Sequence, residues 1–211
     1  MATEKAQLHS TTTRMTHWIV AASSALLFGS GAAIYNRRPS FRLGHHLLAL
    51  PRIPFWMTLT ASPKFVHYAS AAIFVLCGLI YSAWGLRSGH FKDLMMTRAD
   101  AAKLLPMQLY YLRLRREPPE FTGYNPLQKL AYSIVLFVVA PLIVLSGAAL
   151  LPIAMLHPIG AIFIGGVKLW HFGLISLLCL FTIAHVGMVV STGLAKNMSK
   201  MAWLPALPKK A

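Results

Sequence analysis

Four long apolar segments dominate the pattern of hydrophobic and polar positions. They cover residues 15–35, 65–86, 127–151 and 166–190. Each is long enough to cross a bilayer, which takes about 20 mostly apolar residues in a helix. Helices also satisfy their own backbone hydrogen bonds, as a lipid environment requires. The pattern therefore predicts an all-α integral membrane protein, a four-helix bundle that forms a single membrane domain over residues 1–211.

The composition agrees with this prediction. Hydrophobic residues make up 56% of the 211 residues and charged residues only 12%, against about 25% charged in an ordinary soluble domain. Four spans use most of the chain, so no second soluble domain is expected. The net charge of +15 comes from cations dispersed around the apolar spans. That distribution favours contact with anionic membrane lipid over binding of nucleic acid.

The loop charges predict the orientation. If both termini are cytoplasmic, fourteen Lys and Arg residues lie on that side and six on the other, as the positive-inside rule requires. The polar N-terminus has no short apolar region with a cleavage site, so we expect no signal peptide. Cys77 and Cys179 fall in mid-span, where we interpret them as small packing residues.

Four of the nine histidines lie within or at the edge of the predicted spans: His17, His67, His171 and His185. His171 and His185 are fourteen residues apart in one span. Along a helix this spacing returns to within about 40° of the same face, with a rise of ~21 Å. Ionisable residues inside a membrane are costly to bury, which makes these histidines functional candidates.

The predicted topology sorts these histidines by depth into an outer pair, His67 and His171, and an inner pair, His17 and His185. A protein zinc site takes three or four protein ligands, whereas haem iron needs only two axial ligands. Two haems therefore suit the two pairs. Runs of small residues at 29–33 and 146–149 would make room for a flat porphyrin, or would let helices pack closely.

Two other classes remain open from the residues alone. One is a haem-free membrane anchor with structural histidines. The other is a histidine-based metal-ion transporter, which would be expected to carry acidic co-ligands in its spans. The five acids, Glu4, Asp93, Asp100, Glu117 and Glu120, all lie outside the spans.

At the four histidines the chain resembles the bacterial di-haem cytochrome b subunits of formate dehydrogenases, nickel–iron hydrogenases and thiosulfate reductases. In that family the first and second spans give one haem ligand each and the fourth gives two. The matching segments here are RMTHW at His17, KFVHYAS at His67, and WHFGLISLLCLFTIAH from His171 to His185. The resemblance implies two haem b groups, with all four histidines as iron ligands.

A second similarity lies in GYNPLQKLAY, residues 123–132, just before the third span. The family has a similar segment near the cytoplasmic haem, which implies that Asn125, Gln128 and Lys129 contact a quinone, either menaquinone or ubiquinone. The same residues also predict a helix start, with Asn125 as N-cap and Pro126 in the first position. The two interpretations are compatible.

Arg14 and Lys64 each stand three residues before a candidate ligand, His17 and His67. Each therefore lies one turn from that ligand on the same helix face, where it is a candidate contact for a haem propionate. Binding of lipid phosphate is the alternative for both. Pro141 is expected to kink the third span or offset its face.

The resemblance implies a quinone-reactive electron-transfer subunit of the bacterial cytoplasmic membrane. The chain itself has no catalytic constellation for a primary substrate. The implied partner is an external molybdenum or nickel–iron subunit, reached through an iron–sulfur subunit, and electron flow in either direction suits the sequence. The long outer loop, residues 36–63, is expected to be a docking face or a membrane-surface segment, and the loop at 87–124 has an amphipathic stretch expected at the inner membrane surface.

Overall fold

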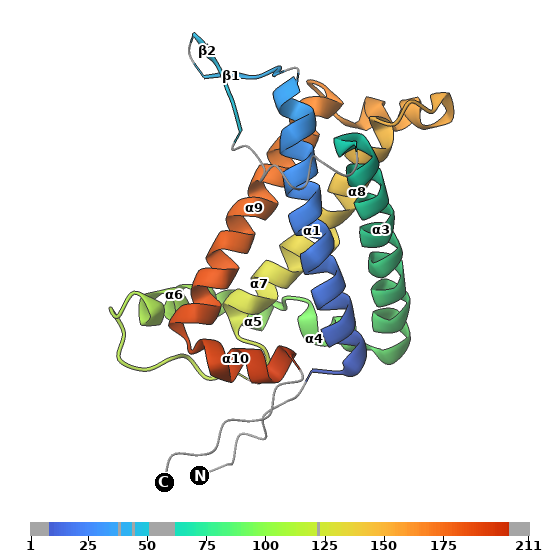
Figure 1. The fold of residues 1–211 in the computed structure, drawn as a ribbon. Coiled ribbons are helices and arrows are strands. Elements are labelled where there is room, and N and C mark those ends of the chain that lie inside the picture. The colour runs from blue at the N-terminus through green and yellow to red at the C-terminus, as the bar shows by residue number, and fades with distance from the viewer. Residues whose placement is uncertain (1–8, 38, 44, 51–61, 122, 203–211) are drawn as a thin grey trace. The chain divides into compact units, whose positions relative to one another are not determined.

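A computed structural model describes residues 9–37, 39–43, 45–50, 62–121 and 123–202. Within this part of the chain, four helices are long and apolar enough to span a membrane (Figure 1). They are α1 (Thr11–Arg37), α3 (Pro63–Ser88), the helix over Pro126–Ala149, and α9 (Val167–Ser191). A helix occupies each of the four predicted spans, and each helix boundary falls within four residues of its expected position.

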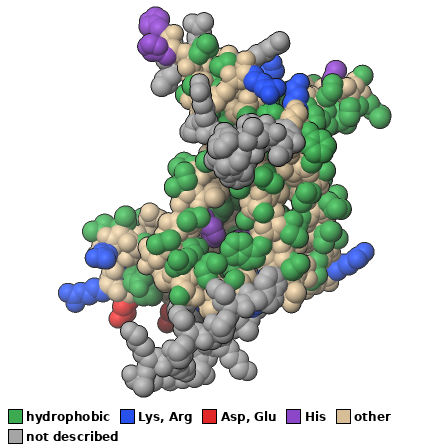
Figure 2. Space-filling view, in the orientation of Figure 1, with side chains coloured by type: hydrophobic (Ala, Val, Ile, Leu, Met, Phe, Trp, Pro, Cys, Tyr) green, Lys and Arg blue, Asp and Glu red, His purple; other side chains and the backbone are tan. Residues whose placement is uncertain are grey.

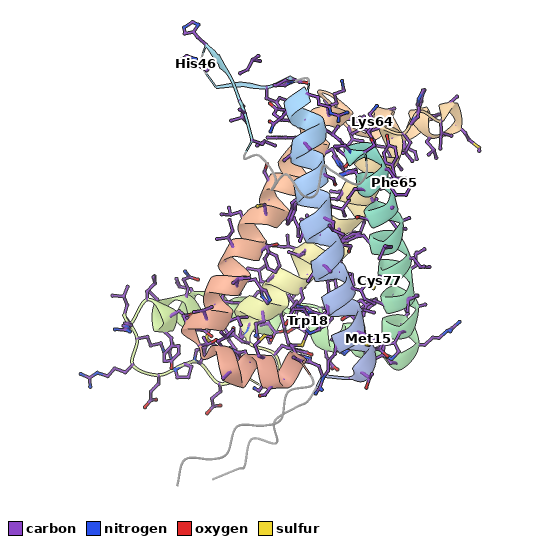
Figure 3. All side chains as sticks on the ribbon, in the orientation of Figure 1. Met15, Trp18, His46, Lys64, Phe65 and Cys77 are labelled. Atoms are coloured by element: carbon purple, nitrogen blue, oxygen red, sulfur yellow. The ribbon has the colours of Figure 1, made fainter. Side chains whose placement is uncertain are left out.

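The chain divides into two compact units, Met1–Ala83 with Ile183–Ala211, and Trp84–Thr182. The first unit contains α1, most of α3, the end of α9 and the short helix α10 (Leu194–Met201). Cys77 on α3 lies beside α1 (Figure 3), where its Sγ is 3.6 Å from the Thr16 carbonyl oxygen. Trp18 Nε1 donates to the Met201 carbonyl at 3.1 Å, which holds the end of α10 against α1.

A small antiparallel hairpin in the first unit departs from the all-α prediction. It pairs β1 (Arg42–Leu43) with β2 (His46–Leu47) within the predicted outer loop. The Asn36 amide donates to the Leu50 carbonyl at 2.9 Å and accepts from the Leu50 N–H at 3.0 Å. These bonds fasten the base of the hairpin to the end of α1. Residues 51–61 of that loop lie outside the described residues.

The second unit begins with three short helices in the predicted cytoplasmic loop, α4 (His90–Leu94), α5 (Arg98–Ala102) and α6 (Leu104–Tyr111). The third span follows as α7 (Pro126–Ile134), a π-helical turn η1 (Val135–Val139) and α8 (Ala140–Ala149). A 3-10 segment, η2 (Ala154–Ile162), leads to α9. The core of this unit packs η1 and α8 against α9 through Val139, Ile143 and Leu174.

The π-helical turn stands immediately before Pro141, where the sequence predicts a kink or an offset. The Ala140 N–H bonds to the Val135 carbonyl, five residues back instead of the four of an α-helix. Proline has no N–H to give to the helix ladder, and its ring crowds the preceding turn. A wider turn at this place relieves that crowding, and it shifts the face of the helix that follows.

The outward faces of the spans are apolar. Phe65 and Leu79 on α3 and Leu180 and Ile183 on α9 each leave more than 60% of their surface exposed. Figure 2 shows hydrophobic side chains over much of the face in view. A soluble protein rarely exposes so much contiguous apolar surface. These faces are suited to lipid, in agreement with the predicted spans.

Candidate functional site

His67, at the start of α3, is held by Ser30 of α1. Ser30 Oγ lies 3.1 Å from His67 Nδ1 and 2.6 Å from the Leu26 carbonyl oxygen. A carbonyl can only accept, so the single hydroxyl hydrogen goes to Leu26 and the serine oxygen accepts from His67 Nδ1–H. This arrangement favours a proton on Nδ1 and an unprotonated Nε2.

Gly31, the next residue on α1, faces the same ring. A Cβ added at Gly31 would lie 3.4 Å from His67 Cε1, an ordinary van der Waals contact. The imidazole thus lies close to the backbone of α1, with room for a side chain no larger than a methyl group between them.

The second unit repeats this arrangement between α8 and α9. Ser146, fully buried, places its Oγ 2.9 Å from His171 Nδ1 and 3.0 Å from the Ile143 carbonyl oxygen. By the same argument this arrangement favours a proton on His171 Nδ1. A Cβ added at Gly147 would lie 3.3 Å from His171 Cε1.

The same four-residue sequence, Ser-Gly-Ala-Ala, builds both arrangements, at 30–33 and at 146–149. From the sequence alone, these small residues indicate only space for a cofactor or close helix packing. The repeated tetrapeptide was the signal that could have indicated a specific role. We refer to Ser30–Gly31 and Ser146–Gly147 as the Ser-Gly cradles.

His17 on α1 and His185 on α9 lie close together in the first unit. Their ring centroids are 6.3 Å apart and their planes are inclined by 58°. Imidazole nitrogen binds a transition metal at about 2 Å, so two rings on opposite sides of one iron have centroids roughly 6 Å apart. The observed separation fits two axial ligands of a single metal.

Two buried nitrogen atoms near the start of α1 have no hydrogen-bond partner among the described residues, His17 Nδ1 and Arg14 Nε. Buried polar groups are nearly always paired, so an unpaired guanidinium N–H indicates a missing acceptor. A carboxylate is the acceptor that arginine prefers. A haem propionate would be such an acceptor for Arg14 Nε, as the sequence predicts. Lys64, at the start of α3 (Figure 3), is exposed.

The residues expected to contact a quinone begin α7. Asn125 Oδ1 accepts from the Leu127 N–H at 2.8 Å, and Gln128 Oε1 accepts from the Asn125 N–H at 3.2 Å. Asn125 Nδ2 also donates to the Tyr111 hydroxyl at 2.9 Å. The predicted helix start is therefore present as a capping box. Contact of these side chains with a quinone stays a prediction.

Lys129 is engaged in an ion pair. Its Nζ lies 3.0 Å and 3.2 Å from the two carboxylate oxygens of Asp100. The Thr97 hydroxyl and N–H also donate to Asp100, at 2.7 Å and 3.0 Å. These hydrogen bonds from Thr97, with those from Lys129 and its charge, hold the pKa of Asp100 at about 2 despite partial burial. A quinone contact by Lys129 would have to share or break this pair.

An apolar cavity of about 200 Å³ lies between α7–η1 and α9 in the second unit. Its walls come from the helix that also carries Gln128, and from the middle of α9. The lining residues are Leu127, Leu130, Ala131, Ile134, Val135, Val139, Leu177, Leu178 and Phe181. All are apolar, so the cavity suits a hydrocarbon group.

The donor set of the described residues fits haem better than a bare metal ion. Among them, no group of three or more His, Cys, Asp or Glu side chains comes together. A protein zinc site needs such a group, whereas a porphyrin supplies four nitrogens and asks the protein for one or two axial ligands. Two close imidazoles, and two others with Nε2 unprotonated, meet that demand.

Comparison with known proteins identifies the family. The model of the family described as prokaryotic cytochrome b561 matches residues 8–203. A protein-methionine-sulfoxide reductase subunit of Azospira oryzae, YedZ1, is 30% identical over 200 residues, covering 90% of this chain and 93% of that protein.

A Ni/Fe-hydrogenase B-type cytochrome subunit of Cupriavidus necator is 26% identical over 144 residues, covering 65% of this chain and 54% of that protein. The match thus spans about half the length of this second relative. No solved structure matched the chain. The resemblance inferred from the histidines and their spacing is confirmed, and the chain belongs to the prokaryotic cytochrome b561 family of multi-pass membrane proteins that bind haem b and transfer electrons.

Proposed function

We propose that this protein is the di-haem membrane subunit of a bacterial oxidoreductase complex and that it exchanges electrons between an external redox partner and the quinone pool. When bound, haem supplies one-electron transfer at its iron. The chain would act as one domain of the cytoplasmic membrane, with both termini inside. Its own side chains would hold and orient the two haems, bind the quinone and admit protons.

The observation that carries this proposal is the approach of His17 to His185. Their ring centroids, 6.3 Å apart, have the separation of two axial ligands on one iron. The unpaired Arg14 Nε, one turn before His17, is available for a propionate of the same group. His17 and His185 would thus hold the inner haem.

His67 and His171 would hold the outer haem. Each has its Nδ1 beside a serine hydroxyl, so Nε2 would be the nitrogen that binds iron. The pairing itself rests on topology, since both residues begin spans that enter from the outer side. His171 and His185 stand fourteen residues apart on α9, a rise of ~21 Å, so the haems would lie at two depths.

Quinone chemistry would take place near the start of α7. Gln128 is exposed there, and its helix lines the apolar cavity, which suits an isoprenoid chain. Asp100 stays ionised at neutral pH because its pKa is held at about 2. Proton exchange with the cytoplasm would therefore use other groups, of which Asp93, Glu117 and Glu120 are described on that side.

The partner would be an external oxidoreductase. One relative is named for a methionine-sulfoxide reductase and the other for a nickel–iron hydrogenase. These names support an oxidoreductase partner, and the second name supports a nickel–iron one. The molybdenum alternative and an iron–sulfur subunit as the electron relay rest on the family resemblance alone. A hydrogenase would feed electrons inward to the quinone, whereas a reductase would draw electrons outward from the quinol.

A reduced-minus-oxidised absorption spectrum of the purified chain, with haem quantified per polypeptide, tests the proposal. We expect a b-type band and two haems. His17→Ala and His185→Ala should each remove the inner haem, and His67→Ala and His171→Ala the outer haem. His46→Ala, on the exposed strand β2 (Figure 3), serves as the control and should keep both.

A wild-type protein without a b-type band would overturn the proposal in favour of a haem-free anchor or a metal-ion transporter. Retention of two six-coordinate haems in any one of the four histidine variants would show that its ligand assignment is wrong. Loss of different haems in His67→Ala and His171→Ala would overturn the proposed pairing.

A further inference from the structure

We propose that Ser30 and Ser146 are positioning residues that fix the protonation and orientation of the two outer haem ligands. This inference rests on the proposed function, because it requires His67 and His171 to be iron ligands. It goes beyond that proposal by assigning a role to two serines that would not touch the haem iron. Ser30 and His67 belong to the first unit, and Ser146 and His171 belong to the second.

The argument begins with the tautomer. A neutral imidazole carries one proton, on either nitrogen, and iron must bind the other nitrogen. At each cradle the serine hydroxyl donates to a carbonyl of its own helix, Leu26 at 2.6 Å or Ile143 at 3.0 Å. The serine oxygen then has only lone pairs to offer to the histidine, so it accepts a hydrogen bond from Nδ1–H. The imidazole proton is thus held on Nδ1, and Nε2 carries no proton.

The serines are themselves fixed. Ser30 is 3% exposed and Ser146 is fully buried, and each hydroxyl is bonded to the backbone of its helix. A hydroxyl that turned to donate to the imidazole would give up this bond to its helix carbonyl, which costs free energy. The glycine beside each serine removes the side chain that would otherwise separate the helix from the ring.

The hydrogen bond also changes the ligand electronically. An Nδ1–H that is bonded to an oxygen acceptor makes the imidazole a more basic ligand, and such outer partners tune metal affinity and redox potential. A more basic ligand stabilises the ferric state over the ferrous state. We therefore expect both serines to lower the potential of the outer haem.

The test is a redox titration of the purified full chain, followed by absorption, together with haem retention under competition by apomyoglobin. Ser30→Ala and Ser146→Ala should each shift the same one of the two haem transitions to higher potential. Each should also weaken retention of that haem by about 10-fold or more. The other haem should be unchanged in both variants.

Ser23→Ala is the matched control. Ser23 lies on the same helix as Ser30, is equally buried at 3% exposure, and donates to the Val20 carbonyl at 3.1 Å. It should leave both transitions where they are. Ser30→Thr and Ser146→Thr retain the hydroxyl, so they should keep the wild-type potential of the outer haem.

Unchanged potential and retention in Ser30→Ala and Ser146→Ala, with two haems in the wild type, would overturn this inference alone. Equal haem loss in the alanine and threonine variants would also overturn it, since the cause would be packing and not the hydrogen bond. Absence of haem from the wild type would overturn the proposed function, and the inference with it.

Discussion

The two cradle glycines differ in how closely they approach their histidines, and this difference is measurable. A Cβ at Gly147 would lie 3.3 Å from His171 Cε1, tighter than ordinary van der Waals contact. We expect Gly147→Ala to displace the imidazole by a few tenths of an ångström. The substitution should also stabilise the helix itself, because alanine is favoured over glycine in a helix interior by about 1 kcal/mol.

The expected result of Gly147→Ala is an altered low-spin electron paramagnetic resonance signal of one haem, without a lower thermal unfolding midpoint. Gly78→Ala on α3 is the control, since a Cβ at Gly78 meets nothing within 4 Å of the described chain. Superimposable haem signals from the two variants would contradict the expected displacement of His171.

The sequence identified the four histidines because buried imidazoles stand out against apolar spans. It did not identify Ser30 and Ser146 as their partners. A serine in a span is equally consistent with a bond to its own helix, as Ser23 makes. Which histidine it meets depends on the rotation of two helices about their axes, and this is set by packing rather than by spacing along one segment.

Among the elements, the cytoplasmic loop is organised by one ion pair, between Asp100 of α5 and Lys129 of α7. The two side chains are only 12% and 14% exposed. The two residues are 29 positions apart in the sequence, Asp100 in the predicted loop and Lys129 near the start of the third span. From the sequence, Lys129 is predicted only as a quinone contact. Their pairing depends on how the short helices fold back, which no local pattern encodes.

The Asp100 pair predicts a specific dependence of stability on pH. The pKa of Asp100 in the folded chain, about 2, is below its ordinary 3.8. An acid whose pKa is lower in the folded chain than in the unfolded chain stabilises the fold at pH values above its unfolded-state pKa. This contribution is lost as the pH falls through its folded-state pKa. Asp100→Asn should cost about 2 kcal/mol at pH 7, with the difference from wild type shrinking between about pH 5 and pH 2.

Thermal unfolding in detergent, followed by circular dichroism over this pH range, measures the effect. Glu117→Gln is the control, because Glu117 is an exposed acid of the same loop. A constant difference between Asp100→Asn and wild type at all pH values would contradict the ionic origin of the stabilisation.

For the whole molecule, orientation is the property that links the inner and outer histidines to a quinone and a partner. The distribution of Lys and Arg predicts both termini in the cytoplasm. The hairpin residue His46 would then face outward and Glu117 inward, and both are exposed. The two native cysteines lie in the spans, Cys77 buried and Cys179 half-buried.

Cysteine labelling in intact cells tests this orientation. A membrane-impermeant maleimide should label His46→Cys, while Glu117→Cys should react only after the cells are permeabilised. The wild-type chain measures the background from Cys77 and Cys179. Labelling of Glu117→Cys and not of His46→Cys in intact cells would invert the orientation, and with it the assignment of inner and outer haems.

The π-helical turn at Val135–Val139 has a consequence for insertions and deletions in this span. A turn closed by a bond from Ala140 to Val135 holds one residue more than an α-helical turn, so a helical wheel drawn through it misaligns the two ends by about 100°. Removing one residue from this turn would restore ordinary α-helix and keep both ends in phase. Removing one between Pro141 and Ser146 would turn Ser146 away from His171. This turn is thus the place in the span where deleting one residue keeps the faces of both ends aligned, although the deletion would bring back the crowding at Pro141 that the wider turn relieves.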